Sequence, residues 1–372
     1  MNRANRRSAG AGFSLQDAPT AARIAAALDE CVKTLKKPVS FMEVCGTHTV
    51  AIAMGGIRSL LPRGVKLLSG PGCPVCVTAP RDIDRLHHTA SRKGVILATF
   101  GDMVRVRGSR GSLESCRENG ADIRVVYSPL DAVELARENH GSKVVFAGVG
   151  FETTAPAIAA SVLEAARLGL KNFYVYPLMK LVPPALETVL SGGGAAVDGL
   201  LLPGHVSAVI GLRPYAFAAG RHKVPCVVAG FEPLDILRAI HMLLRQLAEG
   251  RSVVENEYER AVKTEGNPMA MKAIDEVFRP ADGLWRSLGV IPGSGLVFRK
   301  DFASFDAEKF FQPPDFPNAE PKGCLCGAVL TGRAAPADCR LFGKKCTPAD
   351  PVGPCMVSSE GACAAWYRYG GN

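Results

Sequence analysis

The stretch GPGCPVC contains two cysteines, Cys73 and Cys76, which are separated by two residues and preceded by a Gly-Pro-Gly turn. Glycine and proline at these positions predict a tight loop rather than a core strand, so the two thiols are candidates for chemistry. Such a pair can cycle between dithiol and disulfide, or it can supply half of a zinc site. The spacing leaves both uses open.

A further thiol, Cys45, lies upstream in the stretch EVCGTHT, three residues before His48. A histidine at this distance can serve as a metal ligand or as a proton donor beside the thiol. Residues 78–82 look like the start of a helix, with Thr78 as the N-cap and Pro80 early in the first turn. A thiol near a helix N-terminus is favoured as the thiolate, which is the form that thiol exchange and metal binding require.

The C-terminal part of the chain is dense in cysteine, glycine and proline. Such a segment can hardly build an apolar core of its own, so a metal or a cluster is expected to contribute the missing folding energy. The wide cysteine spacings suit a four-thiolate iron-sulfur cluster, although spacing alone leaves zinc open. The cysteines concerned are Cys324, Cys326, Cys339, Cys346, Cys355 and Cys363.

The remaining three cysteines are expected to be structural. Cys31 falls on an amphipathic helix, Cys116 in a polar stretch and Cys226 inside an apolar strand, where a small hydrophobic residue belongs. His205, in the stretch LPGHVS, is of more interest because it lies at a strand end.

The elements that must position these residues follow an alternating pattern. Short apolar runs rich in Val, Ile and Leu alternate with helical stretches, beginning with a helix over residues 21–37. The runs lack in/out alternation, which is typical of parallel strands covered on both faces by helices. We therefore expect an α/β fold with two open parallel sheets, whose functional loops follow the strands. The expected strands are 39–44, 65–69, 94–100, 123–128, 143–150, 173–177, 197–203 and 224–230.

The expected domain division follows from changes in this pattern of alternating strands and helices. Residues 1–22 are expected to form an N-terminal extension, 23–140 an α/β domain with Cys45 and the CPVC pair, and 141–248 a second α/β domain. The similarity of GVGFETTAPAIA and VAGFEPLDILRAI hints at two related units. Residues 249–372 are expected to form a helical linker, including VVENEYERAVKTEG and NPMAMKAIDEVF, and then a small cysteine-rich lobe.

Composition limits the class of protein. Apolar residues make up 47% of the 372 residues and charged residues 21%, which is typical of an ordinary folded protein. The formal charge is +9, but basic and acidic residues are interspersed, so we favour a solvated surface over nucleic-acid binding. No stretch is apolar and long enough for a signal peptide core or a membrane span. A cytoplasmic location is expected, in which cysteines seldom form structural disulfides.

Taken together, these motifs resemble the HypD family of hydrogenase maturation proteins. The resemblance rests on FMEVCGTHT, GPGCPVCVT, GFETTAP, LPGHVSAVIG and VAGFEPLDIL, and on the long cysteine-rich tail, from about residue 38 to the C-terminus. It implies two α/β domains plus a lobe that holds a 4Fe-4S cluster. It also implies a monomeric scaffold in nickel-iron hydrogenase maturation, which carries iron together with the small chaperone HypC while cyanide, delivered by HypE, and carbon monoxide are installed.

The resemblance assigns roles to individual residues. Cys45 would help to hold the Fe(CN)2CO unit, with His48 as its proton partner, and Cys73 and Cys76 would be redox-active thiols beside it. The cluster ligands would be Cys339, Cys346 and Cys363 with Cys326 or Cys324, and Cys355 is a further candidate. The family often has Gly-Gly-His where this chain has Gly46, Thr47 and His48.

A different class of function also fits the same residues. A free-standing thiol-disulfide oxidoreductase of the ferredoxin:thioredoxin reductase type would use the cluster and the dithiol on protein disulfides. A zinc-stabilised binding module is a third, weaker interpretation.

Overall fold

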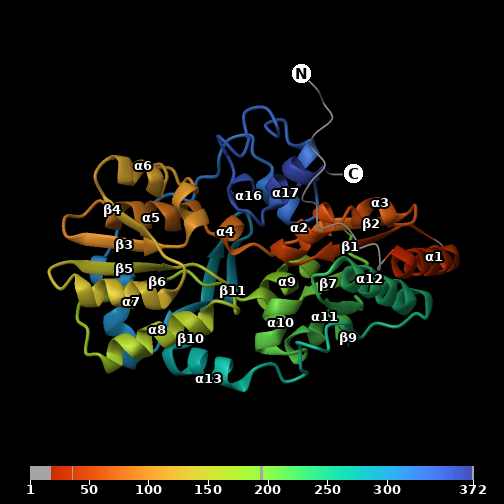
Figure 1. Ribbon diagram of the computed structural model, residues 1–372, viewed down its shortest axis with the longest axis horizontal. Coiled ribbons are helices and arrows are strands. Elements are labelled where there is room, and N and C mark those ends of the chain that lie inside the picture. The colour runs from red at the N-terminus through yellow and green to blue at the C-terminus, as the bar shows by residue number, and fades with distance from the viewer. Residues whose placement is uncertain (1–17, 36, 193–195, 371–372) are drawn as a thin grey trace.

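The computed structural model describes residues 18–35, 37–192 and 196–370. It is an α/β structure with two separate parallel sheets, which lie side by side in Figure 1. All eight strands expected from the apolar runs are present. They are β1 (Val39–Glu43), β2 (Val65–Ser69), β3 (Val95–Thr99), β4 (Asp122–Val125), β5 (Lys143–Gly148), β6 (Phe173–Pro177), β7 (Gly199–Pro203) and β8 (Cys226–Ala229).

The first sheet has the strand order β2-β1-β7-β8-β9, and the short strand β9 covers Val254–Asn256. One face packs against the amphipathic helices α1 (Ala18–Thr34), α2 (Gly46–Met54) and α12 (Pro233–Ala248). The other face packs against α9 (Val182–Ser191) and the short helices α10 (Gly204–Ile210) and α11 (Ala216–Gly220). Burial on both faces explains why these strands read as continuous apolar runs.

The second sheet has the order β4-β3-β5-β6. Its two faces are covered by different helices, and each face has its own apolar core. On one side lie α5 (Pro80–Ala90) and α6 (Leu113–Glu118), and on the other lie α7 (Pro129–Glu138), α8 (Ala155–Arg167) and α13 (Pro268–Val277).

The strand pairing differs from the expected division of the chain at residue 140. The first sheet combines residues 39–69 with residues 199–256, whereas the second sheet is formed by residues 95–177. The chain therefore leaves the first sheet after β2, builds the second sheet, and returns to insert β7 between β1 and β8. Local sequence patterns predict the strands but not their partners, because pairing is decided by contacts between distant segments.

A second difference concerns the stretch VVENEYERAVKTEG, which was expected to be helical. It forms β9 and turns instead, since Cys226 donates its backbone N–H to Val253 O (3.0 Å) and Glu257 donates its own to Val228 O (2.9 Å). Pairing with the edge of β8 overrides the local helical preference. The other expected helix of this region is present as α13.

An antiparallel hairpin, which the sequence did not reveal, links the two sheets to the C-terminal lobe (residues 323–370). It consists of β10 (Phe278–Trp285) and β11 (Gly289–Phe298). In Figure 1 it stands between the two sheets, with the lobe above them. The lobe contains only short helices: α15 (Cys326–Leu330), α16 (Pro354–Val357) and α17 (Ala362–Tyr369).

The tip of this hairpin carries a fully buried arginine, Arg286. Its Nε donates to Thr78 O (2.7 Å), its Nη1 to Glu320 Oε2 (3.3 Å), and its backbone N–H to Val77 O (2.8 Å). A Cβ on Gly327, in α15, would overlap the side chain of the adjacent residue Ser287. The tip therefore holds the segment after the CPVC pair and the start of the lobe together.

We expect the variant Arg286→Met to lower the free energy of unfolding by about 2 to 3 kcal/mol, because hydrogen bonds from a buried charge are lost and their acceptors remain unpaired. Denaturation by urea measures this value. Arg279→Met, on the exposed side of the same hairpin, is the matched control and should change it by less than about 0.5 kcal/mol. Equal stability of the two variants would contradict this role of Arg286.

Candidate functional site

Cys45 lies in the sharp loop between β1 and α2, where it is the N-cap residue of the helix. The buried carboxylate of Glu43 fixes this loop: its Oε2 accepts the backbone N–H of Cys45 (3.3 Å) and its Oε1 accepts the Thr49 hydroxyl (2.6 Å). From the lobe, Glu360 Oε1 accepts the hydroxyl of Thr47 (2.6 Å). The Cys45 thiol is thus positioned from both the sheet and the lobe.

The GPGC turn after β2 packs directly against this loop. Gly46 donates its backbone N–H to Gly72 O (2.9 Å), and a Cβ on Gly72 would overlap the backbone of Val44 and Cys45. Because β1 and β2 are adjacent parallel strands, their carboxyl ends meet at one edge of the sheet. The structure therefore brings Cys45 and Cys73, which are 28 positions apart in the chain, into neighbouring loops.

Cys73 and Cys76 form a disulfide, with their Cα atoms 5.2 Å apart. Cys73 is the N-cap of the single-turn helix α4 (Pro74–Val77), and its sulfur accepts the backbone N–H of Cys76 (3.2 Å). Both side chains are buried, at 3% and 0% exposure. The pair is a two-electron couple in its oxidised form, and water and large substrates have little access to it.

Burial also controls the ionisation of the neighbouring groups. It raises the pKa of the Cys45 thiol to about 11, although the backbone N–H of His48 acts in the opposite direction. It lowers the pKa of His48 to about 4. Both side chains are therefore neutral at pH 7, and a metal that binds Cys45 must displace its proton.

The ring of His48 faces the end of β8 as well as the site. Its Nε2 lies 2.9 Å from Gly230 O and 3.3 Å from Ala229 O, so a neutral ring donates from Nε2 to these carbonyls. Nδ1 is buried and has no hydrogen-bond partner among the described residues. A neutral His48 can thus accept a hydrogen bond at Nδ1, while its low pKa disfavours a protonated ring at pH 7.

His205, in the first turn of α10 directly after β7, belongs to the same group of residues. Its ring stacks on Phe231 with centroids 3.9 Å apart, and the ring centroid of His48 lies 4.7 Å from that of Phe231. Glu360 favours the protonated form of His205, whereas burial of the ring lowers its pKa. The loops after β1, β2, β7 and β8 therefore meet at one edge of the first sheet.

All six cysteines of the lobe line one small, mainly apolar cavity, which we call the cysteine cavity. Cys339 and Cys346 lie on its loops, where Cys346 Sγ accepts the backbone N–H of Val352 (3.3 Å). Cys324, Cys326, Cys355 and Cys363 lie close enough to affect one another's ionisation. The side chains of Cys324 and Cys355 lower the pKa of Cys326, so Cys326 is the favoured thiolate.

The donor set of this cavity fits a cluster held by thiolates, because six soft sulfur donors converge on a site enclosed by apolar side chains. Within the described residues, no group of three or more Cys, His, Asp or Glu side chains is already arranged as a metal site. The thiols are gathered, but which four of them would bind is not fixed by their positions.

The disulfide and the cysteine cavity are neighbours. Cys76 Sγ lies 3.9 Å from Pro354 O, the carbonyl that precedes Cys355, and α4 packs on α16. Cys73, Cys76, Cys326 and Cys355 share one apolar core with Trp285. Of the three expected structural cysteines, Cys31 and Cys116 lie in other apolar cores, whereas Cys226, buried in β8, belongs to this one.

Sequence reasoning missed several residues that hold this site. Glu43 and Glu360 fix the loop of Cys45, and Arg286 holds the CPVC segment. A carboxylate inside the apolar run VSFMEV was a usable signal for Glu43. Glu360 and Arg286 reach the site only through tertiary contacts, so no local pattern could have indicated them.

Glu152, which follows β5, is buried at 3% exposure. Its Oε1 accepts the backbone N–H of Val182 at the start of α9 (2.8 Å), and its Oε2 has no partner among the described residues. Burial raises its pKa from 4.5 to about 7. The folded state therefore holds the proton of Glu152 more tightly than the unfolded chain does.

This shift predicts a pH dependence of stability. Between pH 4.5 and 7 the folded chain binds more protons at Glu152, so the contribution of this group to stability decreases as pH rises. The variant Glu152→Gln has no titrating group at this position, so it does not lose stability in this way. The free energy of unfolding of the variant minus that of the parent chain should therefore increase by about 2 to 3 kcal/mol between pH 5 and pH 8. Urea denaturation across this range measures the difference. The exposed control Glu138→Gln should give a flat difference, and a flat difference for Glu152→Gln would refute the prediction.

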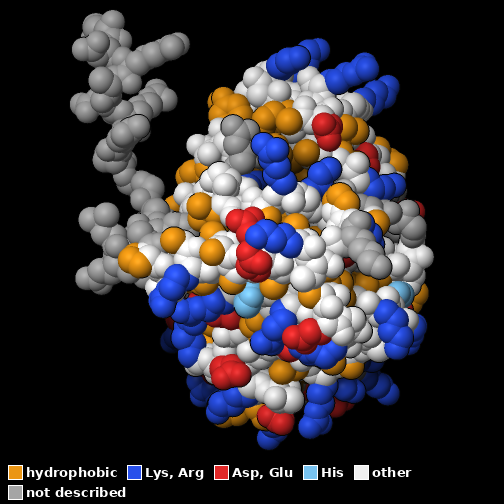
Figure 2. Space-filling view, turned by 90° about the vertical axis from the view of Figure 1, so that its right-hand side faces the viewer, with side chains coloured by type: hydrophobic (Ala, Val, Ile, Leu, Met, Phe, Trp, Pro, Cys, Tyr) orange, Lys and Arg blue, Asp and Glu red, His pale blue; other side chains and the backbone are white. Residues whose placement is uncertain are grey.

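The fold and the site define a class: an α/β protein with a buried dithiol couple at a sheet edge, beside a lobe that gathers six thiols. No helix in the described part of the chain is both long and apolar enough to span a membrane. On the face shown in Figure 2, basic and acidic side chains are interspersed.

Comparisons with known proteins narrow this class. Residues 19–370 match the HypD model, described as "Hydrogenase formation hypA family". The hydrogenase maturation factor HypD of Rhodobacter capsulatus is 47% identical over 357 residues, 94% of each chain. HypD of Escherichia coli is 47% identical over 337 residues, 90% of each chain, and HupD of Azotobacter chroococcum is 48% identical over 357 residues, 94% of this chain and 93% of the relative. The chain belongs to the HypD family of hydrogenase maturation factors.

Proposed function

We propose that this chain is an iron-sulfur scaffold and redox protein of nickel-iron hydrogenase maturation, which holds iron together with a HypC-type chaperone while the Fe(CN)2CO unit is assembled. The observation that carries the proposal is the meeting of Cys45 with the Cys73–Cys76 disulfide at one sheet edge, directly beside the cysteine cavity. Membership of the family supports the same conclusion.

Cys45 supplies the iron ligand in this proposal. Iron that carries cyanide and carbonyl ligands favours soft thiolate donors. Cys45 provides one such donor, and the partner provides another. Because burial holds the thiol in its neutral form, the proton that iron displaces must leave. His48 is the proposed proton partner, and because its pKa is about 4 it would pass this proton on rather than keep it.

The disulfide supplies a two-electron couple. Its reduction breaks the S–S bond between Cys73 and Cys76, takes up two electrons and two protons, and gives two thiols; a thiol reductant is the class of donor required. Because Cys73 and Cys76 have low exposure, they are shielded from exchange with the disulfides of other proteins. The couple would therefore exchange electrons with groups that are bound inside the site.

A 4Fe-4S cluster fits the cysteine cavity, with Cys339, Cys346 and Cys363 as ligands and Cys324 or Cys326 as the fourth. When bound, it supplies electrons one at a time. The chain's own residues hold the cavity closed: Asp102 Oδ2 accepts the backbone N–H of Ser359 (2.9 Å) and the hydroxyl of Ser358 (3.1 Å). A HypE-type protein is the proposed cyanide donor, and the cytoplasm, where thiols stay reduced, is the proposed location.

The burial of the disulfide favours this proposal over a free-standing thiol-disulfide oxidoreductase. An enzyme that reduces protein disulfides must present a nucleophilic sulfur to its substrate. Here Cys76 is completely buried and Cys73 is 3% exposed. A partner that docks on the loops, or a ligand that enters between them, can still reach the site.

Replacing Cys45 tests the iron site. We expect Cys45→Ala to lose iron retention while it keeps the cluster, because Cys45 lies outside the cysteine cavity. Infrared spectra of the anaerobic complex with the chaperone should lack cyanide and carbonyl bands, whereas the control Cys31→Ser should keep them. Hydrogenase maturation by Cys45→Ala at the parental level would refute the assignment.

Serine replacements test the cluster ligands. Cys339→Ser, Cys346→Ser and Cys363→Ser should each lose bound iron and sulfide after anaerobic purification, and only one of Cys324→Ser and Cys326→Ser should do so. The structural Cys116→Ser is the control. If Cys324→Ser and Cys326→Ser both retain iron and sulfide, Cys355 is the fourth ligand. Zinc without sulfide in the parent chain would exclude the cluster.

A further inference from the structure

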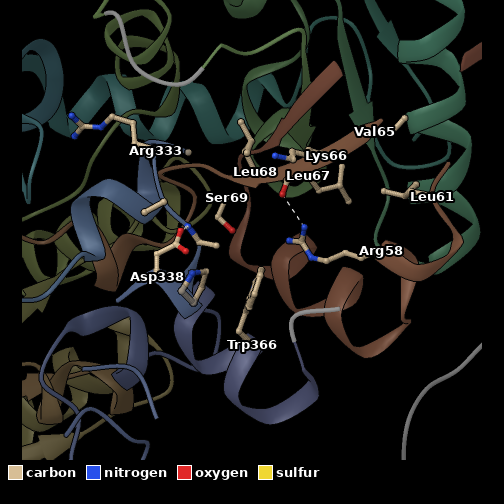
Figure 3. A pocket seen from close by; sticks show the side chains of 14 residues that line it. Arg58, Leu61, Val65, Lys66, Leu67, Leu68, Ser69, Arg333, Asp338 and Trp366 are labelled. Carbon is tan, nitrogen blue, oxygen red and sulfur yellow. Dashed lines mark hydrogen bonds between the residues drawn. The ribbon is translucent and has the colours of Figure 1, made fainter. Parts of the chain in front are cut away.

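A second cavity, which we call the edge cavity, lies between β2 and the C-terminal lobe and has a volume of about 410 Å³. One wall is strand β2, residues 65–69, and the opposite wall is the loop of residues 332–336. Arg58, from α3 (Ile57–Leu60), and Trp366, from α17, close it from below in Figure 3. None of the six lobe cysteines lines this cavity, so it is separate from the cysteine cavity.

Strand β2 is an edge strand, and its free side faces the edge cavity. Val39 donates its backbone N–H to Gly64 O (2.8 Å) and Gly70 donates to Glu43 O (2.8 Å), so even-numbered residues of this segment point their N–H and C=O groups toward β1. Successive residues of a strand point these groups to opposite sides. The N–H groups of Leu67 and Ser69 therefore point toward the cavity.

The side chain of Arg58 supports this geometry. Its Nη1 donates to Leu67 O (2.8 Å), the carbonyl on the free side of the strand, as the dashed line in Figure 3 shows. This bond uses one of the five N–H groups of the guanidinium. Arg58 also lines the edge cavity.

The positive charge of Arg58 is compensated only in part, by the carboxylate of Glu43. Arg58 has no ion pair within 4.0 Å among the described residues, its Nε is buried without an acceptor, and its guanidinium lies 5.5 Å from the centre of the Trp366 ring. A cation removed from water is costly unless an anion compensates it. Burial accordingly lowers the pKa of Arg58.

The other charges of the cavity have the same sign. Lys66 and Arg333 also line it, and both are exposed. The one carboxylate in the lining, Asp338, already accepts the backbone N–H of Ala335 (2.8 Å). Among the described residues, the edge cavity thus combines strand N–H groups without a hydrogen-bond partner, an aromatic ring and an excess of positive charge in its lining.

We propose that the edge cavity binds an extended acidic segment of a protein partner, which adds a strand to the free edge of β2 and places a carboxylate against Arg58. Unpaired strand edges bind extended peptides through main-chain hydrogen bonds, and side-chain contacts provide specificity. Three to five residues match the roughly 13 Å length of residues 65–69.

The position of the edge cavity suits a partner that works at Cys45. Ser69 and Arg58 both act on Glu43, whose carboxylate holds the backbone N–H of Cys45. A segment bound along β2 would therefore lie behind the loop that carries the iron ligand. The inference rests on the proposed function, because the HypC-type chaperone is the partner to which it commits.

Hydrogen-deuterium exchange of the full-length chain with and without this chaperone tests the inference. We expect the amides of Leu67 and Ser69 to become at least ten-fold slower to exchange in the complex.

Arg58→Gln should weaken the complex ten-fold or more, because a carboxylate loses its buried partner. Lys66→Glu, at an exposed position that leaves the core intact, should weaken it further at low salt, since it reverses a charge. Arg63→Gln, an exposed arginine outside the cavity lining, is the charge-matched control and should bind as the parent chain does.

The outcomes separate the two proposals. A complex that forms without protection of residues 65–69, and in which Arg58→Gln and Lys66→Glu bind with parental affinity, would overturn the edge-strand inference and leave the scaffold function standing. If the parent chain and the chaperone form no complex at all, the proposed function fails and the inference fails with it.

Discussion

The close approach of the Gly72 turn to the backbone of Cys45 is the constraint on which the site depends. No side chain fits between the two loops, because a Cβ on Gly72 would overlap the backbone of residues 44 and 45. Gly46 is restricted in a similar way by Glu360, whose backbone oxygen would lie 2.8 Å from a Cβ at that position. These contacts bring three thiols from two strands into one small volume, with little freedom to separate.

The lobe completes the site through polar contacts and through the apolar core that Cys326 and Cys355 share with the disulfide. Its own apolar cluster is small and centres on Cys346, Met356 and Ala364. It is held to the rest of the chain by Asp102, which binds Ser358 and Ser359, and by Glu360, which binds Thr47. A cluster bound by its cysteines would add to this limited stability, since metal binding free energy contributes to folding. The same contacts set the distance between the cysteine cavity and the disulfide.

Burial leaves two groups of the site uncharged at pH 7. His48 is neutral because its pKa falls to about 4, and Cys45 is protonated because its pKa rises to about 11. Burial also raises the pKa of Glu43 to about 7, so this group is partly protonated at neutral pH. Proton release then becomes part of binding, which links iron retention to pH.

The sequence by itself determined the elements and the candidate residues. The apolar runs located all eight major strands, and the cysteine motifs identified the thiols that the structure gathers. Only the tertiary structure decided that β7 inserts beside β1, that residues 254–256 extend the first sheet as a strand, and that the β10–β11 hairpin brings Arg286 to the CPVC segment. The physical reason is that strand propensity and turn chemistry are local, whereas pairing and the burial of Arg286 depend on segments that are far apart in the chain. For the same reason, Cys45 and the CPVC pair could be recognised as separate motifs, but their meeting through Gly72 required the fold.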